Sequence, residues 1–224
     1  MKRYMLLAVC SALSATTLPA TTYLTLTSVD VNRGANVAFL NHGELEYGFA
    51  GVIFATFGNT NVSPLFCVDL FTNIGYDTYA STPLNPRAVR NEDRVAWLYL
   101  NGLNTVVSQD TGLAFQLAIW DIIHDGGDGL SSGQVSTSTF IGLTLTQISL
   151  ANSYVQLSNG HSVTSGVSIY QNFDRYTGAP AQNLIGAAVP GGNVSNPEPS
   201  TWAMLLAGGV LVGTGKLRWR GRGR

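Results

Sequence analysis

The sequence predicts an α+β, β-rich fold, either a β-sandwich or a barrel-like domain, with a small helical insertion. Its residues are 45% hydrophobic but only 11% charged, against about 25% charged in an average soluble domain. Nine Tyr, nine Phe and 25 Gly favour short strands and turns over a helical bundle. Between two distinctive ends lies a body of roughly 175 residues, the usual size of one domain.

Strand-like patterns open this body. Thr22 to Val31 alternates in part between apolar and polar residues, and apolar runs follow at Val37 to Leu40 and Tyr47 to Phe57. Pro64 to Phe71 predicts a further strand, because it is apolar, aromatic and followed by the turn-prone Thr72 to Gly75.

Helical spacing then interrupts the strand pattern, and we predict helices at 87–100, 111–124 and 145–157. Gly102 is expected to end the first helix, and Asp110 to be the N-cap of the second. Closing strands are expected around Ser162 to Tyr170. Gly, Ala, Pro and Asn dominate beyond Tyr176, so we place the β-rich domain at 21–176 and a flexible linker at 177–195.

Positive charge is concentrated in the two ends of the chain. Between residues 21 and 196 there are five Arg, no Lys and twelve acidic residues, a net charge of 5 − 12 = −7. Nucleic-acid binding needs Lys and Arg gathered on one face, so the composition of the body argues against that function.

The first 20 residues are typical of a secretory signal peptide. Lys2 and Arg3 precede the apolar run Met5 to Leu13, and small residues follow it. We expect cleavage between Ser14 and Ala20, which predicts that the domain is exported.

The last segment, 196–224, carries a distinct motif. Pro197, Glu198 and Pro199 precede Ser-Thr, a short apolar stretch and a basic end formed by Lys216, Arg218, Arg220, Arg222 and Arg224. This order resembles the PEP-CTERM sorting signal of Gram-negative bacteria. The resemblance implies that an exosortase, a membrane protease, cuts the tail near the Pro-Glu-Pro motif.

The apolar stretch Ala203 to Gly213 predicts a temporary membrane anchor, because it is shorter than the roughly 20 residues that span a bilayer. The basic end would remain cytoplasmic and the domain would lie outside. We therefore expect the protein to pass through the inner membrane and then reach the cell surface or the extracellular matrix. A C-terminal anchor that is never cut is the alternative.

The cysteine count singles out one residue of the mature protein. Cys10 is lost with the signal peptide, which leaves Cys67 alone. An odd cysteine in an exported protein indicates pairing between chains or a reactive thiol. Burial in the core is the other interpretation.

Two segments, one that contains this cysteine and one about fifty residues later, resemble the thioester domains of bacterial surface adhesins. Phe66-Cys67-Val68-Asp69 matches the aromatic-Cys motif of a strand, and Gln116 to Trp120 matches the Gln-x-x-apolar-Trp motif of a helix. The resemblance implies that the Cys67 sulfur and the Gln116 side-chain carbonyl are joined in an internal thioester. Phe115 precedes Gln116 where these adhesins often have Thr.

The residue types suit that chemistry. A cysteine sulfur is a nucleophile, and a glutamine carboxamide becomes an acyl group when it loses ammonia. Trp120 lies one helical turn after Gln116 and is expected to shield the bond from water. Phe66 and Asp69 are expected to support the site, as is His124 through proton transfer. A solvated helix end is the other interpretation of His124.

Other chemistries have little support in the sequence. The three histidines are isolated, and no phosphate-binding loop, Ser-His-Asp order or internal repeat is present. The run from Asp125 to Gly129 resembles a calcium loop but lacks the spacing and final Glu of an EF-hand, so we interpret it as a turn. We expect no metal, no cofactor and no enzymatic turnover.

We therefore expect an exported surface or matrix protein that attaches covalently to an amine or hydroxyl partner, a polysaccharide or a protein, through the thioester. Amines open thioesters, so a body without lysine would not quench itself. The alternative is a non-reactive structural or glycan-binding surface protein with the same fold.

Overall fold

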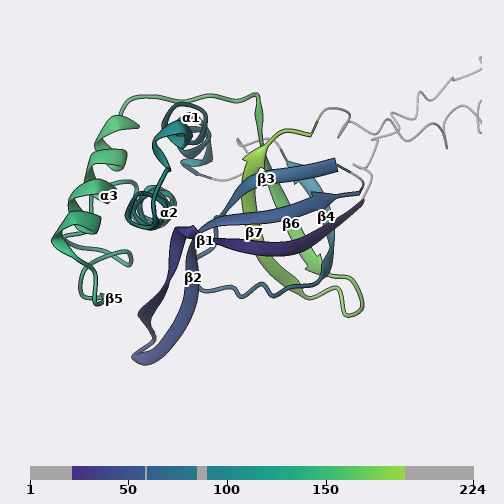
Figure 1. Ribbon diagram of the computed structural model, residues 1–224, viewed down its shortest axis with the longest axis horizontal. Helices are drawn as coiled ribbons and strands as arrows, with labels where there is room; N and C mark the ends of the chain where they lie inside the picture. Colours follow the sequence, from purple (N-terminus) through teal and green to yellow (C-terminus); the bar gives the residue numbers. More distant parts are fainter. Residues whose placement is uncertain (1–21, 59, 85–89, 190–224) are drawn as a thin grey trace, which may run out of the picture. The chain divides into compact units, whose positions relative to one another are not determined.

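The structure is a computed structural model, and it describes residues 22–58, 60–84 and 90–189 (Figure 1). These residues belong to one compact unit, Thr21–Gly192. The predicted signal peptide and the Pro197-Glu198-Pro199 tail lie outside the described residues. Within the described ranges, none of the helices is long and apolar enough to cross a membrane.

The described part of the chain contains seven strands, and all of their pairings are antiparallel. They are β1 (Thr22–Asn41), β2 (Glu44–Phe57), β3 (Thr60–Cys67), β4 (Thr78–Leu84), β5 (Phe140–Ile141), β6 (Val167–Asp174) and β7 (Pro180–Ala187). The sheet order is β2-β3-β7-β6-β4-β1-β5, and β1 also pairs with β2. This extra pairing closes six strands into a ring, so the domain is β-rich and barrel-like rather than a sandwich.

The first two strands form a hairpin that extends beyond the barrel (Figure 1). They join through His42 and Gly43, which both have positive φ, as a type I′ two-residue turn requires. The register shifts between Val29 and Gly34. The part of β1 before the shift pairs with β4, and the part after it pairs with β5, so the shift separates a barrel half from an outer arm.

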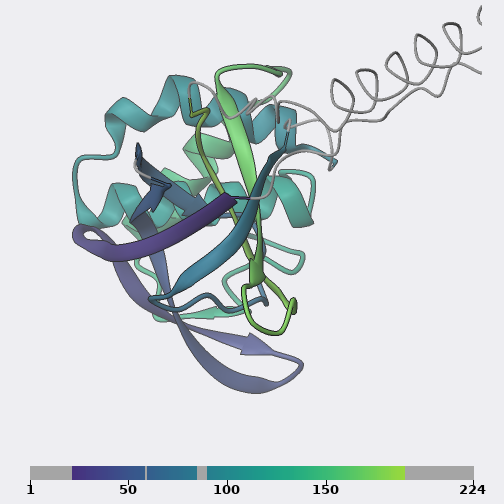
Figure 2. The ribbon, with the colours of Figure 1, turned by 90° about the vertical axis from the view of Figure 1, so that its right-hand side faces the viewer.

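The helices are inserted between β4 and β6. They are α1 (Glu92–Gly102), the 3₁₀ turn η1 (Leu103–Thr105), α2 (Gln109–His124) and α3 (Leu145–Leu157). Helix α2 contacts α3, β1, β2 and β3, and its residues from Gly112 to Ile122 are all buried. In Figure 2 the barrel strands face the viewer and the helices lie behind them. The insertion therefore packs a fully buried helix against the barrel.

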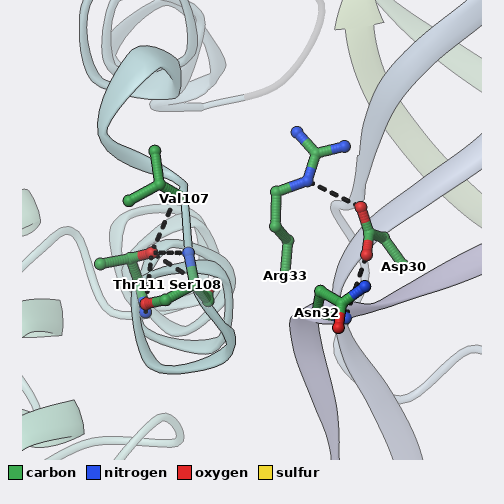
Figure 3. Close-up of polar contacts among 6 residues, drawn as sticks. All are labelled: Asp30, Asn32, Arg33, Val107, Ser108 and Thr111. Atoms are coloured by element: carbon green, nitrogen blue, oxygen red, sulfur yellow. Dashed lines mark hydrogen bonds and ion pairs between the residues drawn. The ribbon is translucent and has the colours of Figure 1, made fainter.

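The helices confirm one of the predicted helix ends and correct the other. Helix α1 ends at Gly102, as predicted. The N-cap of α2 is Ser108, so the prediction of Asp110 is wrong. The Ser108 hydroxyl accepts the Thr111 N–H, and the Thr111 hydroxyl accepts the Ser108 N–H, which together form a capping box (Figure 3).

The linker prediction differs from the structure. Pro180–Ala187, placed in the linker at 177–195, forms β7 and lies between β3 and β6. Gly186 of this strand is required by close packing, because a Cβ there would overlap the Leu65 side chain. Strand β4 was not predicted either, and the strand predicted to reach Phe71 ends at Cys67.

A glycine sets the distance between α2 and β1. A Cβ at Gly112 would lie 2.1 Å from the Arg33 carbonyl oxygen, so the first turn of α2 touches the backbone of β1. Arg33 also forms an ion pair of 2.7 Å with Asp30, seen opposite the capping box in Figure 3. The start of α2 is thus fixed by its N-cap and by direct contact with the main chain of β1 at Arg33, where the register of β1 shifts.

Gly112→Ala tests this contact. Alanine favours a helix by about 1 kcal/mol over glycine, yet here we expect the free energy of unfolding to fall by about 1–3 kcal/mol, because the methyl group overpacks the contact with Arg33. Denaturant titration measures the change. Gly75→Ala, at a glycine outside the helices, is the control for adding a methyl group, since its Cβ would make only an ordinary 3.8 Å contact. A Gly112→Ala protein as stable as the parent would contradict the close approach.

Candidate functional site

Cys67 is the last residue of β3, where that strand pairs with Leu184 of β7. It is a free cysteine, and its side chain is 3% exposed. Burial raises the pKa of the Cys67 thiol, and the negative charge of Asp69 raises it further. The sulfur is therefore held as a thiol at neutral pH, and it needs a proton acceptor before it can act as a nucleophile.

Gln116 lies in the middle of α2 and is fully buried. Its Oε1 accepts the Cys67 N–H at 2.9 Å, and its Nε2 donates to the Cys67 carbonyl oxygen at 2.7 Å. Both the oxygen and the nitrogen of the carboxamide are thus hydrogen-bonded to one residue, which lies 49 positions earlier in the chain. The structure brings together the two residues that the sequence singled out.

Asp69 and His124 lie beside this pair at the end of β3. The His124 Nε2 is 3.3 Å from the Val68 carbonyl oxygen, and its ring is half-buried. Burial raises the pKa of the Asp69 carboxyl, while the Asn183 N–H and the charge of His124 lower it. The charge of Asp69 acts on the thiol, and His124 contacts the main chain of the residue that follows Cys67.

Strand β7 supplies two contacts that sequence reasoning missed. The Asn183 N–H donates to Asp69 Oδ2 at 2.7 Å, and Gln182 Nε2 donates to the Asp69 carbonyl oxygen at 2.7 Å. These contacts fix the chain directly after Cys67. The sequence predicts a linker in this segment, so nothing in it indicated contacts with the site.

Trp120 is 3% exposed and stacks on Phe140 at 5.8 Å between ring centroids. Its indole N–H has no partner among the described residues. Phe66 is fully buried and packs against Phe115 at 4.9 Å. Because successive residues of a strand point to opposite faces, Phe66 and Cys67 lie on different faces of β3. Phe66 therefore packs in the core on the face away from the sulfur, whereas Trp120 lines the same cavity as Cys67.

A cavity of about 670 Å³ opens beside Cys67 and Trp120, and both residues line it. The β1–β2 arm and the segment after β3 supply most of the remaining wall. Aromatic and amide side chains are prominent in the lining: Phe39, Tyr47, Phe49, Tyr76, Asn36, Asn73, Gln109 and Gln182. None of the described residues that line it is charged. The cavity therefore gives an uncharged route to the buried sulfur.

Comparison with known proteins does not identify a family for this chain. No family model matches the chain, and no curated protein matches it. Among solved structures, it is similar to the N-terminal domain of the Streptococcus pyogenes pilus tip adhesin Cpa. That similarity has 16% identity and a TM-score of 0.39, and it covers 73% of this chain and 97% of that chain. It is too low to assign a function, and neither resemblance noted from the sequence is shown by a family match.

The reciprocal hydrogen bonds can be tested apart from any thioester in a Cys67→Ala protein, which keeps the main-chain N–H and carbonyl. In that background we expect Gln116→Ala to lower the free energy of unfolding by about 2–4 kcal/mol, because a cavity and two unpaired buried groups result. Gln109→Ala, at an exposed position of the same helix, should change it by less than about 0.5 kcal/mol. Equal effects in denaturant titrations would contradict the proposed role of the contact.

Proposed function

We propose that this protein is an exported surface or matrix protein whose barrel forms an internal thioester between Cys67 and Gln116 and uses it to attach covalently to a partner. The observation that carries the proposal is the pair of hydrogen bonds between the Gln116 carboxamide and the Cys67 main chain. They hold the acyl group beside the residue that bears the nucleophile. A buried pair of this kind, next to a cavity, supports chemistry that water must not reach.

Bond formation requires one exchange at the Gln116 Cδ atom. The Cys67 sulfur attacks Cδ, the C–N bond breaks, and the thiol proton leaves with the amide nitrogen as ammonia. The Cys67 N–H on Oε1 is oriented to stabilise the negative charge that develops on that oxygen. We assign Asp69 and His124 to carrying the proton, because burial disfavours the free thiolate.

Attachment reverses the roles at the same carbon. An amine or hydroxyl of the partner enters the cavity and attacks Cδ, the C–S bond breaks, and the Cys67 thiol is restored with the partner's proton. The product is an amide or ester on Gln116. The bond is consumed in one event, so we propose a single-use binder rather than an enzyme. A body without lysine supports this function, since it offers no side-chain amine of its own.

Export and sorting are proposed from the sequence. The signal peptide would direct secretion, and an exosortase-type protease would cut near Pro197-Glu198-Pro199 after the tail had paused in the inner membrane. The domain would then reach the surface or matrix, where polysaccharide and protein partners are available.

A second function is favoured by the cavity lining. Tyr47 and Tyr76 are 71% and 67% exposed, and amide side chains lie among the other lining residues. Aromatic faces and neutral amides suit a sugar ligand, so non-covalent glycan binding is the alternative use of this cavity.

Intact-mass measurement tests the thioester. We expect the protein to be one ammonia lighter than its sequence mass and to gain one methylamine on incubation with that amine. Cys67→Ala and Gln116→Ala should each have their full sequence mass and show no reaction. Gln156→Ala, at an exposed position of α3 outside the cavity lining, serves as the matched control and should behave as the parent. A parent at full sequence mass, with Cys67 alkylated by iodoacetamide after unfolding, would contradict the thioester. Glycan binding would then be the remaining proposal.

The sorting route is tested by mapping the C-terminus of protein recovered from the outer surface of the cell. We expect it to end near Pro199. A C-terminus at Arg224 on that material would overturn the predicted cleavage.

A further inference from the structure

Three carboxylates meet where α2 ends. Asp121 lies in the last turns of α2, Asp125 is its C-cap, and Asp128 follows in the next loop. Each offers an oxygen, and these oxygens lie within 4.8 Å of one another. The sequence interpretation of this run as a turn did not include Asp121, because helical geometry was needed to bring it to the loop.

Asp121 is the unusual member of the cluster, because it is fully buried. Its Oδ2 accepts the Gly129 N–H at 3.2 Å, whereas its Oδ1 has no hydrogen-bond partner among the described residues. Burial raises the pKa of Asp121 to about 6, the Gly129 N–H lowers it, and the charges of Asp128 and Asp125 raise it. An unpaired carboxylate oxygen in the interior is costly unless a cation binds it.

No cationic side chain of the described ranges binds this cluster directly. None of the three carboxylates forms an ion pair there. Partial burial lowers the pKa of Arg94 and the negative charge of Asp121 raises it, so Arg94 lies near the cluster. Its guanidinium N–H groups, however, donate to neutral oxygens, namely those of Ser158, Gly126 and Val155. The charge of the cluster is therefore left without a direct partner.

We propose that Asp121, Asp125 and Asp128 bind a calcium ion. Calcium takes six to eight oxygen ligands at about 2.3–2.6 Å in irregular geometry, which the spacing of these oxygens accommodates. Magnesium demands a near-ideal octahedron and suits such a set less well. Main-chain oxygens or water would complete the shell.

The surroundings support the cluster as a built site. The Asp125 carboxylate is held by the Gln134 and Val135 N–H groups at 3.0 and 2.7 Å, so the loop up to residue 135 is tied to it. Gly133 allows this approach, because a Cβ there would lie 2.5 Å from the Asp125 carboxyl carbon. Asp128 is exposed and gives the ion access from solvent. Bound calcium would tie this loop to the helix that carries Gln116 and Trp120.

The test uses the full-length chain treated with EDTA and dialysed free of the chelator. Addition of calcium chloride should raise Tm by roughly 2–4 °C and release or absorb heat in a calorimetric titration, with a Kd no weaker than about 1 mM, as in extracellular calcium modules. Asp128→Asn should abolish both effects, and its exposed position makes a folding defect unexpected. Asp77→Asn, at an exposed aspartate outside the cluster, should keep both.

Failure of calcium to change Tm or produce heat up to about 10 mM, which is tenfold above that Kd, would overturn the proposal. So would an equal response in the Asp128→Asn protein. A response to magnesium but not to calcium would overturn the assignment of the ion. The site does not depend on the thioester, so a Cys67→Ala protein should respond to calcium as the parent does.

Discussion

The paired hydrogen bonds between the Gln116 carboxamide and the Cys67 main chain are the constraint on which the site depends. They cross between α2 and β3, which also pack together through the rings of Phe66 and Phe115. A buried carboxamide is tolerated only when its donor and acceptor are both used. Gln116 therefore specifies one position of α2 against the barrel, and this position determines which residues surround the sulfur.

The helix is fixed on either side of that contact. At its start, the Ser108 cap and the absence of a side chain at Gly112 set α2 against the backbone of β1. At its end, Asp121 and Asp125 connect it to the following loop. The ring of strands gives β3 a partner on each side, so Cys67 is presented by a part of the barrel that cannot easily shift. Rigid support on both sides would suit the thioester that we propose, because such a bond must be protected until a partner arrives.

The sequence predicted those features of the structure that depend on residues close together in the chain. Helical spacing identified all three helices of the described part, and Gly102 marked the end of α1. Cys67 and Gln116 were singled out by short motifs, and the structure places them in contact. The features that were missed depend on packing between distant segments. Strand β7 has a glycine at Gly186, where the Leu65 side chain packs closely, and its Pro, Ala, Asn and Gly residues are also typical of a linker. Asp121 joins its acidic neighbours only through the helix end.

A crystal structure of freshly purified protein that has not been exposed to amines tests the central claim most directly. The thioester predicts continuous electron density from the Cys67 sulfur to the Gln116 Cδ atom, with no amide nitrogen on that carbon. An intact carboxamide that keeps both hydrogen bonds to the Cys67 main chain, with the sulfur and Cδ at van der Waals separation, would contradict it.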